Sequence, residues 1–119
     1  MSVAMQHEQD NVYRVEMSGR LQRADFERCE AALADEMRRV GHVKLLFVLE
    51  NFEGWGPGSG WNDLSFYVQH GDAIDRIAIV GDPRWQAEAL MFAAAGLRRA
   101  PVEFFDNADL AAARSWLSA

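Results

Sequence analysis

The sequence contains little cysteine, no excess of positive charge and no long apolar run, and each shortage excludes a class of protein. Cys29 is the only cysteine among 119 residues, so an internal disulfide is excluded and a reducing compartment is expected. The formal net charge of −6 disfavours nucleic acid as a partner, because phosphate binding needs a basic face. No run approaches the roughly 18 apolar residues of a membrane-spanning helix.

Signals for export and for electrostatic membrane docking are also missing. The first residues, MSVAMQHEQD, lack a basic segment followed by an apolar one, so no secretory signal is expected. Negative charge disfavours docking on anionic lipid but leaves apolar insertion at a membrane surface open. The expected location is therefore the cytoplasm, with peripheral membrane contact left open.

Catalytic and nucleotide-binding motifs are absent as well. Glycine occupies positions 54, 56, 58 and 60, but the G-x-G-x-x-G spacing and the G-K-[ST] signature are missing and Pro57 interrupts the run. There is no G-x-S-x-G or Cys/His pattern for a nucleophile. The glycines are therefore expected to serve backbone angles that other residues avoid.

Histidines and acidic residues give no metal or acid–base site in the sequence. His7, His42 and His70 are far apart, and none has a metal-ligand neighbour at helical or strand spacing. Glu50 and Glu53 flank the predicted cleft and could form a carboxylate pair, but no partner acid accompanies them. We therefore predict no catalytic residue, no metal and no cofactor, and hence no enzyme.

Length and hydrophobic patterning predict one α/β domain over residues 1–119. The chain is 50% hydrophobic and carries no linker, repeat or low-complexity tract. Alternating strand and helix patterns give the order β-β-α-β-α-β-α-β-α, a mixed five-stranded sheet with about four helices. A first hairpin is antiparallel, and the later strands are parallel because helices separate them. The strands are expected at 2–6, 12–17, 45–49, 75–80 and 102–105, and the helices at 23–40, 61–69, 84–97 and after the cap Asp106.

The helix at 23–40 has one apolar stripe and ends at Gly41. Cys29 lies on that stripe without a histidine or cysteine within a helical turn, so it is predicted to be a small buried hydrophobe rather than a reactive thiol. The stripe consists of Phe26, Cys29, Leu33, Met37 and Val40.

The stretch from 43 to 69 is the most informative part of the chain. The apolar run VKLLFVLE predicts a buried central strand, NFEGWGPGSGW predicts a loop after it, and NDLSFYVQ predicts an unusually aromatic helix. In alternating α/β domains, ligands bind in the crevice beyond the carboxyl ends of the strands. The sequence therefore places a candidate site at this loop.

Two crossovers carry more aromatic and apolar surface than one sheet face can bury. Such an excess indicates an apolar ligand pocket or an interface with a partner. Methionine and tryptophan side chains are suited to pockets that adapt to their ligand. The alternative is that these residues only form the hydrophobic core and a homodimer interface. Gly54, Gly56, Gly58 and Gly60 are predicted to form a hinge between the two helices. The predicted ligand-binding residues are Phe52, Trp55, Trp61, Leu64, Tyr67, Val68, Trp85, Met91 and Phe92.

Several segments resemble the SpoIIAA-like proteins, small bacterial relatives of the STAS domain (sulfate transporter and anti-sigma-factor antagonist). They are VYRVEMSGRL, VKLLFVLENFEGW, WNDLSFYVQHGDAIDRIAIVGDPRW and VEFFDNADLAAARSWL. The resemblance implies a STAS-like fold, also likened to the CRAL-TRIO lipid carriers, and homodimers or higher oligomers. It further implies a small apolar or lipid-like ligand held between two mobile helices, membrane contact and no enzyme activity.

The resemblance also implies an alternative function, a STAS-type regulatory module that binds a protein partner. Anti-sigma antagonists carry a phosphorylatable serine in an Asp-Ser-Ser-like turn at the start of a helix. The nearest match is Ser59 followed by Gly60, but no aspartate precedes that serine and the glycine loop is longer. Ser59 is more simply the N-cap of the helix that begins near Trp61. It stays a candidate phosphoacceptor.

Overall fold

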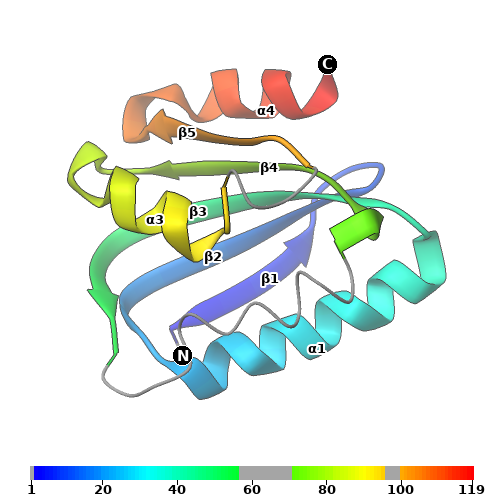
Figure 1. Cartoon of the computed structure of the whole chain (residues 1–119), viewed down its shortest axis with the longest axis horizontal. Helices are drawn as coiled ribbons and strands as arrows, with labels where there is room; N and C mark the ends of the chain where they lie inside the picture. Colours follow the sequence, from blue (N-terminus) through cyan, green and yellow to red (C-terminus); the bar gives the residue numbers. More distant parts are fainter. Residues whose placement is uncertain (1, 57–70, 96–99) are drawn as a thin grey trace.

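A computed structural model describes residues 2–56, 71–95 and 100–119 (Figure 1). Its centre is a five-stranded sheet in which each strand lies beside the next one in the sequence. The first two strands are antiparallel and all the others are parallel, as predicted. The strands are β1 (Val3–His7), β2 (Val12–Leu21), β3 (Val43–Trp55), β4 (Ile74–Gly81) and β5 (Val102–Asp106).

The described residues form the helices α1 (Arg23–Val40), α3 (Gln86–Phe92) and α4 (Leu110–Ser118). The helix predicted at 61–69 lies outside these residues. Short 3₁₀ turns at Gly71–Ala73, Pro83–Trp85 and Asn107–Asp109 precede β4, α3 and α4. None of the helices in the described ranges has the length and apolar character of a membrane span.

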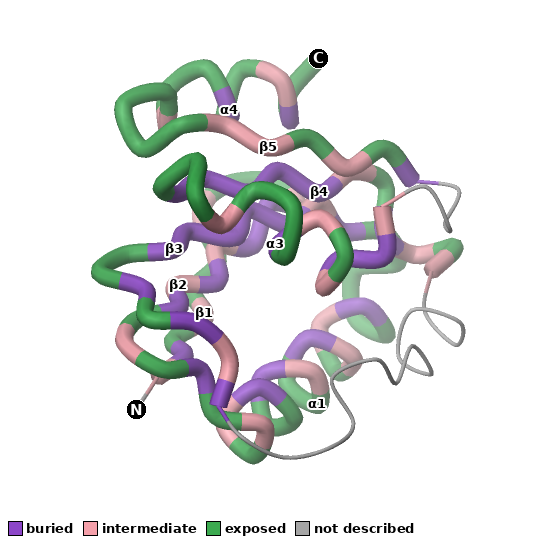
Figure 2. Tube along the Cα trace, turned by 60° about the vertical axis from the view of Figure 1, so that its left-hand side comes forward, coloured by how far each residue is buried: buried purple, intermediate pink, exposed green. Residues whose placement is uncertain are grey.

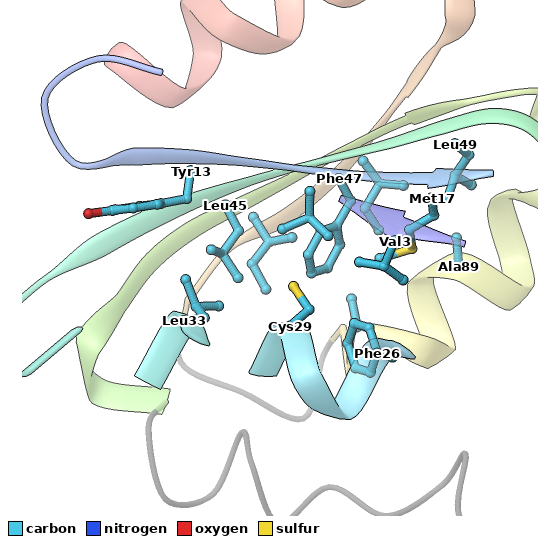
Figure 3. Close-up of a cluster of buried hydrophobic side chains, with 14 of the residues drawn as sticks. Val3, Tyr13, Met17, Phe26, Cys29, Leu33, Leu45, Phe47, Leu49 and Ala89 are labelled. Atoms are coloured by element: carbon cyan, nitrogen blue, oxygen red, sulfur yellow. The ribbon is translucent and has the colours of Figure 1, made fainter. Parts of the chain in front are cut away.

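Helices cover both faces of the sheet, with α1 and α3 on one side and α4 on the other (Figure 1). Buried residues follow the central strands and the inward side of α1 (Figure 2). Figure 3 shows Cys29 and Leu33 of α1 directed toward Leu45 and Phe47 of β3. The predicted apolar stripe of α1 therefore packs on the sheet, apart from Val40 at its end, which is exposed.

Cys29 behaves as the sequence predicts. The side chain is buried in the core under the sheet, and this burial, helped by the charge of Glu30, raises the pKa of the thiol to about 12. A thiolate is the reactive form of cysteine, so at neutral pH this residue is a packing group.

The predicted end of strand β3, at residue 49, is wrong. The strand continues through Asn51–Trp55, where a loop was predicted. Its pairing with β2 shifts register twice, so that Gly19 lies opposite Phe52 and Arg20 opposite Gly54. The two extra residues on β3 bulge outward, and Asn51 adopts a left-handed φ of 49°. These bulges turn the ring of Phe52 back into the core.

The predicted helix at 84–97 is too long. After a 3₁₀ turn, α3 ends at Phe92. Ala94 has a φ of 59°, and the N–H groups of Ala94 and Ala95 donate to the carbonyl oxygens of Met91 and Leu90. This is a Schellman closure, which glycine usually makes. The alanine-rich sequence favours helix and gives no local signal for this end.

The predicted cap Asp106 is confirmed, and Asp82 caps the turn before α3 in the same way. The carboxylate of Asp82 accepts a hydrogen bond from the backbone N–H of Arg84 at 2.9 Å, and Pro83 takes the next position, where no donor is needed. Asp106 accepts from the N–H of Ala108 at 3.0 Å. Both caps fix the direction in which the chain leaves the end of a parallel strand.

An ion pair ties the turn between β1 and β2 to α4. Arg114 donates to both carboxylate oxygens of Glu8, from Nη2 at 2.8 Å and from Nε at 3.1 Å. These hydrogen bonds hold the pKa of Glu8 below its ordinary value of 4.5. Because the folded-state pKa is depressed, the stabilisation is present above that ordinary value and is lost as the pH falls through the lowered pKa.

We therefore expect Arg114→Gln to lower the free energy of unfolding by about 1 kcal/mol at pH 7. The difference from wild type should shrink as the pH falls below about 4, because protonated Glu8 no longer gains from the arginine. Urea unfolding between pH 7 and pH 3 measures both. The control is Arg38→Gln, which removes an exposed pair with Asp35 within α1. A pH-independent loss in the Arg114 variant would show that the pair contributes only packing.

Candidate functional site

Aromatic side chains gather where β3 ends, and we term Phe52, Trp55, Trp85 and Phe92 the aromatic cluster. The ring of Phe52 packs edge-on against Trp55 at 5.0 Å and against Trp85 at 5.2 Å between centroids. Trp55 lies 5.5 Å from Phe92. Such tilted and edge-to-face pairs are the favoured geometry of aromatic contacts. All members were predicted as ligand-binding residues, and the structure brings them together.

The position of each residue in the aromatic cluster is set by the strand, turn or helix to which it belongs. Phe52 and Trp55 belong to the bulged end of β3, Trp85 ends the 3₁₀ turn after β4, and Phe92 is the last residue of α3. Phe92 also lies 4.8 Å from Phe26 of α1. The aromatic cluster is therefore continuous with the core between α1 and the sheet.

Gly54 provides the space that Trp85 occupies. A Cβ on Gly54 would lie 3.2 Å from Cη2 of the tryptophan, and the glycine has a φ of 103°. Both facts require glycine, because a side chain would press on the ring and strain the backbone. The indole of Trp85 therefore lies over the β3 backbone. The guanidinium carbon of Arg84 lies 5.2 Å from the centre of the Trp85 ring, within range of a cation–π contact.

The predicted hinge is only partly within the described residues. Gly54 lies inside β3, and the N–H of Gly56 donates to the carbonyl oxygen of Leu21 at 2.7 Å. A Cβ on Gly56 would lie 2.9 Å from that same oxygen. These two glycines are thus held against β2, and the hinge role stays a prediction. Gly58, Ser59 and Gly60 lie outside the described residues.

Met91, which was also predicted as a ligand-binding residue, does not join the aromatic cluster. Met91 is 78% exposed on the outer side of α3, because Phe92 and Ala89 take the inward positions of this short helix. Trp61, Leu64, Tyr67 and Val68 lie outside the described residues and stay predictions.

Two cavities open beyond the strand ends, where the sequence places the site, and we term them the strand-end cavities. The larger, of about 400 Å³, is bordered by Phe52 and Trp85. The smaller, of about 350 Å³, lies toward Arg14 and Leu110. They adjoin, because Leu49, Asn51 and Asn107 line both. The larger cavity is completed by Glu53, Asp82 and Arg84, and the smaller by Val48, Glu50 and Val80.

Glu50 and Glu53 were predicted beside the cleft, but other polar residues of these cavities were missed by the sequence analysis, although a signal for them exists. Asn51, Asp82 and Asn107 each follow the apolar part of a parallel strand, and parallel strands bring such residues to one edge of the sheet. Glu50 lines only the smaller cavity and Glu53 only the larger. The two carboxylates therefore border different spaces.

The described histidines have hydrogen-bonding surroundings, as predicted. Nδ1 of His42 lies 3.0 Å from a carboxylate oxygen of Asp75, and Nε2 of His7 lies at hydrogen-bond distance from the carbonyl oxygen of Asp10. Among the described residues, no group of three or more histidine, cysteine, aspartate or glutamate side chains could hold a metal ion. His70 lies outside them.

The fold is that of a STAS-like α/β domain, with an antiparallel edge strand on a parallel sheet and helices on both faces. A model of the SpoIIAA-like family matches residues 12–118, so the chain belongs to the SpoIIAA-like family. At the level of this family, the fold supports a non-catalytic module that regulates or binds.

A solved structure has the same fold. The crystal structure of an uncharacterized protein with a SpoIIAA-like fold from Shewanella loihica superposes with a TM-score of 0.73 at 23% sequence identity. The alignment covers 97% of this chain and 91% of that one. A search of curated protein sequences gave no significant match.

Proposed function

We propose that this protein is a non-catalytic binding module that holds a small apolar or lipid-like ligand against the aromatic cluster. The observation that carries the proposal is that Phe52 and Trp85 pack edge-on at 5.2 Å and both border a cavity of about 400 Å³. Small-molecule sites typically have volumes of roughly 300–1,000 Å³, and this cavity combines that size with an apolar wall of Leu49, Phe52 and Trp85.

The walls of that cavity favour a ligand with two chemically different ends. Phe52, Trp85 and Leu49 offer apolar surface, whereas Asn51 and Asn107 offer amide groups at the strand ends. An apolar body gains free energy on the aromatic side because its surface leaves water. The amides can hydrogen-bond a polar end and so fix its orientation.

Native mass spectrometry of the purified protein, followed by organic extraction, tests the proposal. We expect a homodimer that carries a small apolar or lipid-like molecule. A ligand-free dimer that also binds no added apolar probe would contradict the proposal. It would favour the alternative, a STAS-type regulatory module whose apolar surface serves self-association and a protein partner.

Trp85→Ala is expected to weaken the binding of the apolar probe N-phenyl-1-naphthylamine by about tenfold, because a wall of the cavity is lost. A fluorescence titration measures this change. Trp116→Ala is the matched control, since Trp116 packs on Phe105 under α4, on the opposite face of the sheet. Equal affinities in the two variants would place the probe elsewhere.

A further inference from the structure

Trp55 carries a polar group that the fold leaves without a partner. The Nε1 atom of its indole is buried, and no residue of the described chain accepts a hydrogen bond from it. Among the described residues, the rings that contact the Trp55 indole are those of Phe52, Trp85 and Phe92, at 5.0, 6.1 and 5.5 Å between centroids. Phenylalanine rings have no acceptor atom, and an indole N–H is itself only a donor.

A buried donor without an acceptor is costly, and tryptophan N–H groups in protein interiors usually find a partner. Leaving such a group unpaired destabilises a protein, whereas supplying an acceptor in a dry, apolar site restores the bond at full strength. An unpaired N–H inside an aromatic cluster is therefore a place where a bound molecule with an accepting atom gains more than a pure hydrocarbon does.

We propose that the Trp55 N–H is the donor that orients the ligand, and that the ligand carries an accepting oxygen beside its apolar body. This proposal rests on the proposed function and names the class of ligand. The larger strand-end cavity next to Phe52 and Trp85 is lined by Glu53 and Asp82 against Arg84. Because acidic groups outnumber basic ones there, a neutral carbonyl or ester is favoured over a carboxylate.

The burial of the Trp55 N–H determines how a ligand can reach it. Since Nε1 is buried, a ligand reaches it only when the atoms that cover it move aside. The apolar body of the ligand then packs against the rings of the aromatic cluster, and its oxygen accepts a hydrogen bond from the N–H.

Two neutral probes of nearly equal size isolate the hydrogen bond. 2-Acetylnaphthalene has a carbonyl oxygen where 2-ethylnaphthalene has a methylene group. We expect wild type to bind the acetyl compound about tenfold more tightly. Trp55→Phe should abolish that preference while keeping an aromatic ring, and calorimetric titration measures both affinities. Trp116→Phe, on the opposite face, should keep the preference.

A second measurement needs no variant. In an ¹H–¹⁵N spectrum, the Trp55 indole N–H of wild type should move downfield with 2-acetylnaphthalene and not with 2-ethylnaphthalene. If both probes bind wild type equally, or if Trp55→Phe keeps the preference, the role of the N–H is overturned while the proposed function stands. If neither probe binds wild type, both proposals are overturned.

Discussion

Replacing Phe52 with alanine is expected to lower the free energy of unfolding by about 3–5 kcal/mol, the usual range for a buried phenylalanine. The side chain is only 4% exposed, and it makes edge-on contacts with both Trp55 and Trp85. The variant loses the transfer free energy of the ring, leaves a cavity and breaks two aromatic pairs. Urea unfolding at pH 7 measures the change.

Two further substitutions show how much of this loss in the free energy of unfolding comes from apolar volume and how much depends on the burial of the ring. Phe52→Leu keeps most of the apolar volume and should cost well under half as much. Phe105→Ala removes the same ring from a half-buried position under α4, so its cost should also be smaller. If Phe52→Ala and Phe105→Ala unfold at the same urea concentration, the ring of Phe52 is not packed as described.

The sequence pattern predicted an aromatic concentration on two crossovers, and the structure brings four of its members together, while their ligand-binding role stays a prediction. Phe52, Trp55, Trp85 and Phe92 were selected because two neighbouring crossovers carry excess aromatic surface, and parallel strands bring the ends of such crossovers together. Met91 was selected on the same ground and lies 78% exposed. A helix of one or two turns has few inward positions, and composition does not tell which residues take them.

The ends of β3 and α3 depend on contacts that no local pattern contains. Glycine and asparagine usually end strands, yet Gly54 pairs with Arg20 of β2 and Asn51 bulges out of the sheet. Alanine favours helix, yet Ala94 takes the left-handed position that closes α3. In both places tertiary contacts override the intrinsic preference of the residue.

The location of the cavities could be predicted, but most of their lining could not. The rule for parallel sheets places a crevice beyond the carboxyl ends of the strands, and both cavities lie there. Arg14 and Leu110 border the same space because β2 and α4 lie on either side of the strand end. Hydrophobic patterns predict the strands and helices but not how these elements are arranged in space. The proximity of Arg14 and Leu110 is therefore seen only in the structure.

Gly54→Ala is expected to lower the free energy of unfolding by about 2–4 kcal/mol, because backbone strain and a steric clash act together. At a φ of 103° the backbone is strained for alanine, and the new Cβ would lie 3.2 Å from Trp85. The indole must shift, and its contact with Phe52 loosens. Urea unfolding measures the loss, and tryptophan fluorescence reports the displaced ring.

Gly41→Ala separates the cost of backbone strain from the cost of the steric clash with Trp85. Gly41 has a φ of 90°, and nothing lies within 4 Å of its missing Cβ, so this variant bears the backbone strain alone. The excess loss in Gly54→Ala therefore measures how firmly Trp85 is seated on β3. An equal loss in both variants would mean that the indole moves away freely, in which case the aromatic wall of the larger cavity is not fixed by the fold.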